Sequence, residues 1–81
     1  MAIRSRVKLL LYQRNRPRVE AGEKPLTLHD VALATGIAYA ALRKLANNQS
    51  TRIDLQTIDR LCVYFETGVG DVLEHTPDQA R

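Results

Sequence analysis

The chain has 81 residues, a length that supports one compact domain and leaves little room for a second. Its single cysteine, Cys62, excludes an internal disulfide, and with only two histidines the spacing assembles no set of metal ligands. No segment approaches the roughly 20 apolar residues that span a bilayer, and no signal peptide is recognisable. We therefore expect a cytoplasmic protein that uses no metal, cofactor or membrane.

The charged residues are distributed unevenly along the chain. The first 18 residues carry six basic side chains and no acidic one, whereas the rest carries six basic and nine acidic side chains. This asymmetry suits a protein that turns one side toward a polyanion such as DNA, although it also fits an ordinary solvated surface. We predict that the N-terminal arginines add affinity for DNA that does not depend on the base sequence.

Apolar residues recur at helical spacing almost throughout the chain, which predicts an all-α fold. A first helix is expected over residues 5–15, although the alternation in residues 3–7 also permits a short extended start. Pro17 is expected to end this helix, because the residue before a proline avoids the helical conformation. Residues 16–25 are then expected to form an exposed loop.

The second predicted helix, Leu28–Thr35, has the clearest start and stop signals. Thr27 and Asp30 have the spacing of a capping box, in which each side chain bonds the backbone N–H of the other residue. Gly36 can adopt the left-handed conformation that ends a helix. A third helix is expected over residues 38–46, with Asn47 and Asn48 as its terminator.

A fourth helix is expected over Leu55–Phe65, with Asp54 as its cap and Gly68 and Gly70 closing it. Its apolar residues recur every three or four positions and predict one buried stripe, formed by Leu55, Ile58, Leu61, Cys62 and Phe65.

A last single turn is expected over residues 71–74, with three apolar side chains covering the core: Val69, Val72 and Leu73. The whole chain, residues 1–81, is expected to form one domain, with residues 1–4 and 76–81 flexible.

Residues 27–47 meet the geometric demands of a helix-turn-helix. Two short helices that cross closely need a small residue at the crossing, a residue of positive φ in the turn and an apolar plug after it, and these are Ala32, Gly36 and Ile37. If Leu42 and Leu45 face inward, the third helix turns one face outward, made of Tyr39, Ala40, Arg43, Lys44 and Asn47. Cations, a methyl group and a phenol on one face suit the major groove of DNA.

Further motifs follow this block, and together they span roughly residues 7–75: Val31-Ala32, Thr35-Gly36-Ile37, Leu42, Leu45, Asn47, Arg52-Ile53-Asp54-Leu55, Thr57-Ile58-Asp59-Arg60-Leu61-Cys62 and Gly70-Asp71-Val72-Leu73-Glu74. This combination resembles the Cro/XRE group of helix-turn-helix repressors, in particular its short single-domain bacterial branch. The resemblance implies a compact five-helix, lambda-repressor-like domain. It also implies a homodimer that binds double-stranded operator DNA and regulates transcription, with residues 38–46 in the major groove.

The resemblance also implies roles for individual residues. Bases would be read by Tyr39, Ala40 and Lys44, with Arg43 beside them. Phosphates would be held by Thr27, Asn47, Gln49, Ser50, Thr51 and Arg52. Ala38 stands where the family usually has a serine or threonine that caps the helix and binds phosphate, and His29 lies close enough for a phosphate contact. The loop of residues 16–26 is longer than is typical of the family.

Two other classes of function compete with this interpretation. The same scaffold can serve as a protein-interaction module, such as an antitoxin that binds a partner protein. An enzyme fits less well, because the chain has no serine–histidine–acid pattern, no metal set and no phosphate-binding glycine loop.

Overall fold

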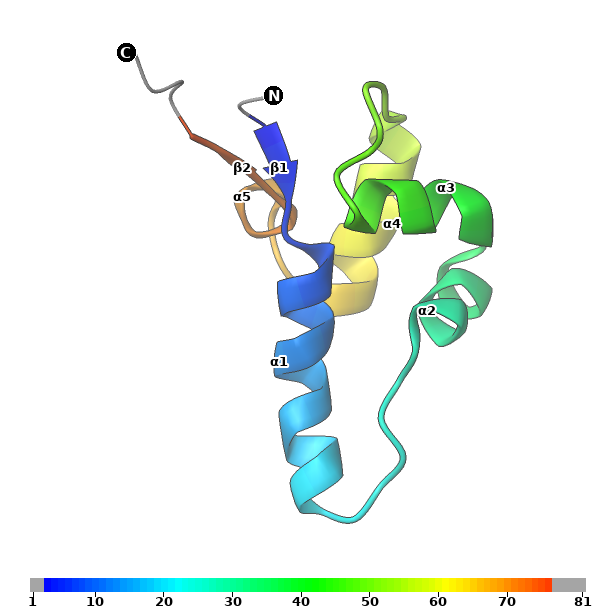
Figure 1. Cartoon of the computed structure of the whole chain (residues 1–81), viewed down its shortest axis with the longest axis vertical. Coiled ribbons are helices and arrows are strands. Elements are labelled where there is room, and N and C mark those ends of the chain that lie inside the picture. Colours follow the sequence, from blue (N-terminus) through cyan, green and yellow to red (C-terminus); the bar gives the residue numbers. More distant parts are fainter. Residues whose placement is uncertain (1–2, 77–81) are drawn as a thin grey trace.

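The computed structural model describes residues 3–76, which fold into five helices and two short strands (Figure 1). In chain order these elements are β1 (Ile3–Ser5), α1 (Val7–Glu20), α2 (Leu28–Thr35), α3 (Tyr39–Ala46), α4 (Leu55–Phe65), α5 (Val69–Val72) and β2 (Leu73–His75). The predicted five-helix fold is confirmed, with a small sheet added to it. None of the helices formed by residues 3–76 is long and apolar enough to cross a bilayer.

Each of the five helices contributes one completely buried apolar side chain to a common core: Val7, Val31, Leu42, Leu61 and Val72. Burying a side chain of this size contributes about 1.5–3 kcal/mol. The core therefore fixes how α3 sits relative to the other helices. Cys62 is half-buried against this core, as the sequence predicted for a small apolar residue.

β1 and β2 pair in antiparallel fashion and join the two ends of the described chain. The register places Ile3 opposite His75 and Ser5 opposite Leu73, and the Arg6 amide extends the pairing by donating to the Val72 carbonyl (2.7 Å). The extended start that the alternation permitted is therefore confirmed. Residues 3 and 4, expected to be flexible, lie in β1, whereas residues 1–2 and 77–81 fall outside the described range.

The predicted last turn over residues 71–74 is wrong in its position. α5 ends at Val72, and Leu73–His75 is a strand because its backbone groups pair with β1, some 70 residues earlier in the chain. Val72 and Leu73 cover the core as predicted, but Val69 is 57% exposed.

The prediction that Pro17 ends the first helix is also wrong, because α1 continues to Glu20. Proline cannot donate the backbone hydrogen bond to the carbonyl four residues earlier, here that of Gln13, and Gln13 is exposed to water. The distal part of the helix is held by its side chains instead. Arg18 donates to the Lys24 carbonyl (2.8 and 3.1 Å) and forms an ion pair with Glu23 (3.4 Å).

This distal part of α1 and the segment that follows it project from the rest of the molecule (Figure 1). The principal extents are 46 × 26 × 20 Å, and the radius of gyration is 13.4 Å. A compact chain of this length would have a radius of gyration of about 12 Å. The long loop expected over residues 16–26 therefore begins with helix, since α1 extends to Glu20. Together with the end of α1 it gives the molecule its elongated shape.

The two ends of α4 differ from expectation. Asp54 occupies the cap position, but its side chain makes no capping hydrogen bond. Leu55 is not part of the buried stripe, since it is 86% exposed, whereas Ile58, Leu61 and Phe65 are buried. The helix is closed by Glu66 in the left-handed conformation (φ 55°), two residues before Gly68. The Thr67 amide satisfies the Cys62 carbonyl there (2.9 Å).

Candidate nucleic-acid interface

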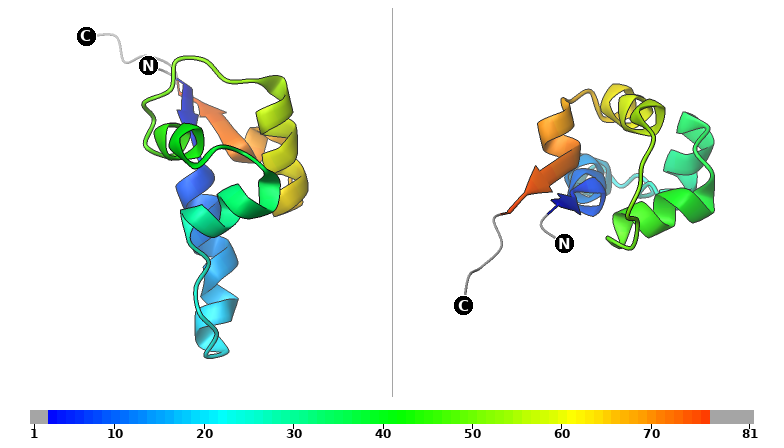
Figure 2. Two further views of the ribbon diagram at one scale, coloured as in Figure 1. Left: turned by 90° about the vertical axis from the view of Figure 1, so that its right-hand side faces the viewer. Right: turned by 90° about the horizontal axis from the view of Figure 1, so that it is seen from above.

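α2 and α3 are joined by a tight turn of the kind that the sequence predicted. Gly36 has a positive φ of 76°, and its amide donates to the Ala32 carbonyl (2.9 Å). Ala32 is buried at the crossing, and Ile37 is buried directly after the turn. Figure 2 shows the result: α3 lies at one surface of the molecule, on the opposite side from α4.

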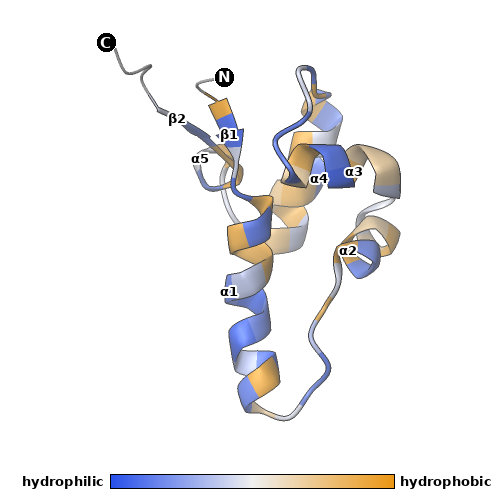
Figure 3. Cartoon of the chain, viewed as in Figure 1, coloured by the Kyte–Doolittle hydropathy of each residue, from blue (hydrophilic) through white to orange (hydrophobic). Residues whose placement is uncertain are grey.

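α3 has a sharply divided surface. Leu42, Leu45 and Ala46 are buried, whereas the predicted DNA face is exposed to solvent along its whole length: Tyr39, Ala40, Arg43, Lys44 and Asn47. Figure 3 shows the hydrophilic stretch of α3 between hydrophobic ones. The buried side chains fix the rotation of the helix about its axis, and so they determine which side chains can reach a ligand.

Arg43 and Lys44 carry the positive charge of this face. Neither side chain has a hydrogen-bond or ion-pair partner among residues 3–76. In contrast, two N-terminal arginines that the sequence offered for DNA have partners inside the protein. Arg18 binds Glu23 and the Lys24 carbonyl, and Arg14 donates to the Tyr64 carbonyl (2.8 Å). The free cations on α3 are therefore better placed to meet an anionic ligand than Arg14 or Arg18.

The first residue of α3 contacts the start of α2. The rings of His29 and Tyr39 are stacked, with centroids 4.3 Å apart and planes 22° from parallel. The sequence suggested a phosphate contact for His29 and gave no sign of this stack, because ring contacts across a turn depend on the helix crossing. Ala38, just before Tyr39, makes no side-chain cap, as expected for alanine.

The start of α2 carries the predicted capping box. The Thr27 amide donates to the Asp30 carboxylate (2.8 Å), and the Asp30 amide donates to the Thr27 hydroxyl oxygen (3.1 Å). Hydrogen bonds from the backbone and then the side chain of Thr27 hold the pKa of Asp30 below its ordinary value of 3.8. Thr27 is exposed, and its hydroxyl hydrogen remains available for a ligand.

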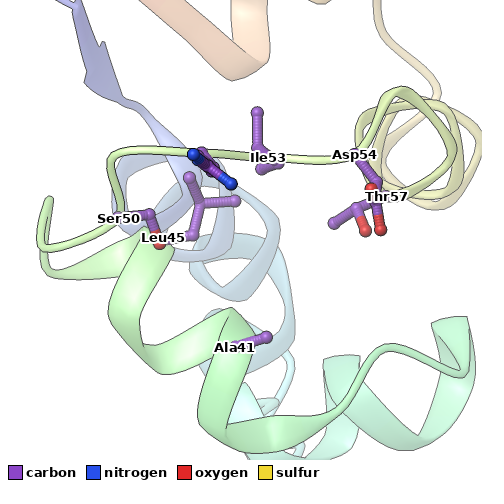
Figure 4. A pocket seen from close by; sticks show the side chains of 7 residues that line it. Ala41, Leu45, Ser50, Ile53, Asp54 and Thr57 are labelled. Carbon is purple, nitrogen blue, oxygen red and sulfur yellow. The ribbon is translucent and has the colours of Figure 1, made fainter.

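The segment after α3 holds the remaining predicted phosphate contacts: Gln49, Ser50, Thr51 and Arg52. Ser50 is half-buried and the other three are exposed. An open hollow of about 500 Å³ separates this segment from α3 and α4 (Figure 4), and its wall is made by Ala41, Leu45, Ser50, Arg52, Ile53, Asp54 and Thr57. The exposed side chains of this segment therefore border an open space that a ligand can reach.

Three polar residues outside the predicted site hold the helix-turn-helix in place. Asn15 on α1 exchanges two hydrogen bonds with the backbone of Leu26 (2.7 and 2.9 Å), just before α2. Asn48, with a positive φ of 60°, accepts from the Ser5 amide (2.6 Å). Arg60 on α4 donates to the Gly36 carbonyl (3.4 Å) in the turn. Of these, Asn48 was expected from the sequence as a helix terminator and Arg60 belongs to a motif of the resemblance, whereas nothing in the sequence indicated the role of Asn15.

The comparison with protein families decides what kind of domain this is. The family model of the Cro/C1-type HTH DNA-binding domain matches residues 18–78. The chain belongs to the Cro/C1-type helix-turn-helix family. Like the other members of the Cro/C1-type family, it is a DNA-binding domain of the kind found in transcription regulators. No curated protein and no solved structure matches the chain.

The matched range contains both helices of the Cro/C1-type motif, the turn and the segment after α3. β1 and most of α1 lie before it. The C-terminal end of α1 and the connection that follows it lie within the match.

Proposed function

We propose that this protein is a sequence-specific regulator of transcription that binds double-stranded DNA as a homodimer and represses its target genes. α3 enters the major groove, with Tyr39, Ala40, Arg43 and Lys44 toward the base edges. The observation that carries this proposal is the exposed face of α3, on which Arg43 and Lys44 have no partner within residues 3–76.

Each side chain has a chemical role in this proposal. Arginine and lysine donate hydrogen bonds to guanine O6 and N7, and an alanine methyl group packs against the methyl group of thymine. Tyr39 donates its hydroxyl hydrogen to a base edge or a phosphate. Ala40 makes no directional bond, so discrimination between bases depends mainly on Tyr39, Arg43 and Lys44.

The phosphates on either side of the groove are held by groups around α3. Their donors are the Ala38 backbone amide and the side chains of Thr27, Asn47, Gln49, Ser50, Thr51 and Arg52. Contacts of this kind fix the position of the protein on the duplex without reading its sequence. Repression follows when the bound protein occupies an operator that the transcription machinery needs.

The decisive experiment is a selection from randomised duplex DNA, followed by a salt titration on the enriched sequence. We expect a palindromic site whose half-sites lie about one helical turn apart, because a two-fold dimer places two copies of α3 on one face of the duplex. Enrichment of no sequence, with weak and steeply salt-dependent binding, would contradict the proposal. A protein partner would then be sought by co-purification.

A further inference from the structure

The stack between His29 and Tyr39 lies outside the core and needs its own explanation. His29 is exposed, and Tyr39 is 39% exposed. Neither ring has a hydrogen-bond partner among residues 3–76. The two rings nevertheless form a stacked pair, with centroids 4.3 Å apart and planes 22° from parallel. This pair contributes little to the buried core, and its free edges face the solvent.

The place of the stack in the motif indicates what it does. His29 is the second residue of α2, and Tyr39 is the first residue of α3. A side chain normally caps the start of such a helix, but Ala38 has none to offer. The stacked rings therefore form a side-chain contact that joins the start of α3 to the start of α2.

We propose that His29 is a positioning residue: it holds the Tyr39 ring in one orientation and thereby directs its hydroxyl toward a single base pair. This inference rests on the proposed function, and it adds a residue of α2 to the determinants of base specificity. An unsupported tyrosine on a helix surface has several rotamers, and fixing it on binding lowers affinity. A preformed stack removes that loss before DNA arrives.

The proposal differs from a simple phosphate contact in what it predicts. A phosphate contact by His29 would strengthen binding to all sequences alike and would steepen the salt dependence. A positioning role strengthens the preference for one base pair, the same one that Tyr39 reads. The stabilisation typical of an aromatic pair corresponds to a change of about 2- to 10-fold in the ratio of affinities for the preferred and the changed base pair.

The test compares four variants with the wild type on the selected operator and on its single base-pair changes: H29A, H29F, Y39A and the double variant H29A/Y39A. Thermal unfolding of each variant checks that it is folded. We expect Y39A to lose preference at one base pair and H29A to lose about 2- to 10-fold at the same base pair. H29F keeps a ring in place and restores the preference, and the double variant resembles Y39A.

Several outcomes would overturn the inference and leave the proposed function standing. One is an H29A protein that weakens binding to all sequences equally; another is failure of H29F to restore the preference. A third readout needs no DNA: the ring protons of Tyr39 should change chemical shift in H29A, and unchanged shifts would show that the rings are not stacked in solution. If instead the wild type selects no sequence, the proposed function fails and the inference fails with it.

Discussion

The guanidinium group of Arg14 contacts other parts of the protein and is therefore not free to contact DNA. It donates to the Tyr64 carbonyl at 2.8 Å and lies over the rings of Tyr64 and Phe65, at 5.4 and 5.7 Å from their centroids. These contacts tie α1 to the end of α4. The side chain that the sequence offered for phosphates therefore stabilises the fold.

Replacing Arg14 by alanine should lower the free energy of unfolding by about 1–3 kcal/mol, since it removes a charged hydrogen bond and a cation–π contact. Arg16 is a matched control, because it is exposed and its side chain has no bonded partner among residues 3–76. R16A should change stability by less than about 0.5 kcal/mol. Denaturant unfolding of both variants measures the difference, and equal stabilities would rule out the role given to Arg14.

Lys44 is one of the residues that we propose to contact base edges in the major groove. Lys44→Ala should weaken binding to the selected operator by about 1–3 kcal/mol, the loss expected for one good base contact, with little change for unrelated DNA. Lys24→Ala removes the same charge from the connection before α2 and should leave base discrimination intact. Titration of labelled duplexes gives both affinities. Operator affinity unchanged in K44A would rule out base reading by this lysine.

At the scale of an element, α2 depends on a carboxylate at its first turn. The bonds from Thr27 lower the pKa of Asp30 in the folded protein below the value of 3.8 that applies when the chain is unfolded. A lowered folded pKa means that ionised Asp30 stabilises the fold above pH 3.8, and that this contribution is lost as the pH falls through the folded pKa.

The variant D30N removes this titration while keeping the shape of the side chain. At neutral pH it should be less stable than the wild type, and the difference should shrink as the pH falls below 3.8. Denaturant unfolding across a pH series measures it. Asp59 is exposed on α4 and its side chain has no hydrogen-bond partner among residues 3–76, so D59N is the matched control. A difference between D30N and wild type that stayed constant down to acid pH would contradict the capping role of the charge.

α1 shows how tertiary contacts overcome a local signal. A proline in a helix interior typically costs about 3 kcal/mol. Here the helix nevertheless passes Pro17, because contacts on both sides of it fasten the connection that follows: Asn15 holds Leu26, and Arg18 holds Glu23 and Lys24. The projecting shape is thus an element-scale consequence of a few polar bonds.

At the scale of the whole molecule, the charge asymmetry gives a testable consequence for DNA binding. Lys8 and Arg16 lie on the exposed side of α1 and are free of partners within residues 3–76, unlike Arg14 and Arg18. If each contacts a phosphate, changing both to glutamine should flatten the slope of log affinity against log salt by nearly two units. An unaltered slope would show that this face of α1 is turned away from the duplex.

The sequence by itself determined most of the helix-turn-helix. The capping box, the positive φ of Gly36 and the inward leucines of α3 are local or periodic features, because they depend on residues within one or two helical turns of each other. The outward face of α3 also follows from local periodicity, because the positions of the buried leucines determine which side chains point outward. These features also placed the candidate base-reading residues of α3 at the surface, where the structure has them.

Only the tertiary structure decided the rest, because those features join residues that are far apart in the chain. Three such contacts join residues at least 43 positions apart: the β1–β2 pairing, the Ser5–Asn48 hydrogen bond and the hydrogen bond from Arg14 to the Tyr64 carbonyl. The His29–Tyr39 stack requires α2 and α3 to cross at one particular angle. Neither helical periodicity nor a capping motif encodes such contacts, since both repeat over only a few residues. Folding brings these groups together, and there they override signals such as Pro17.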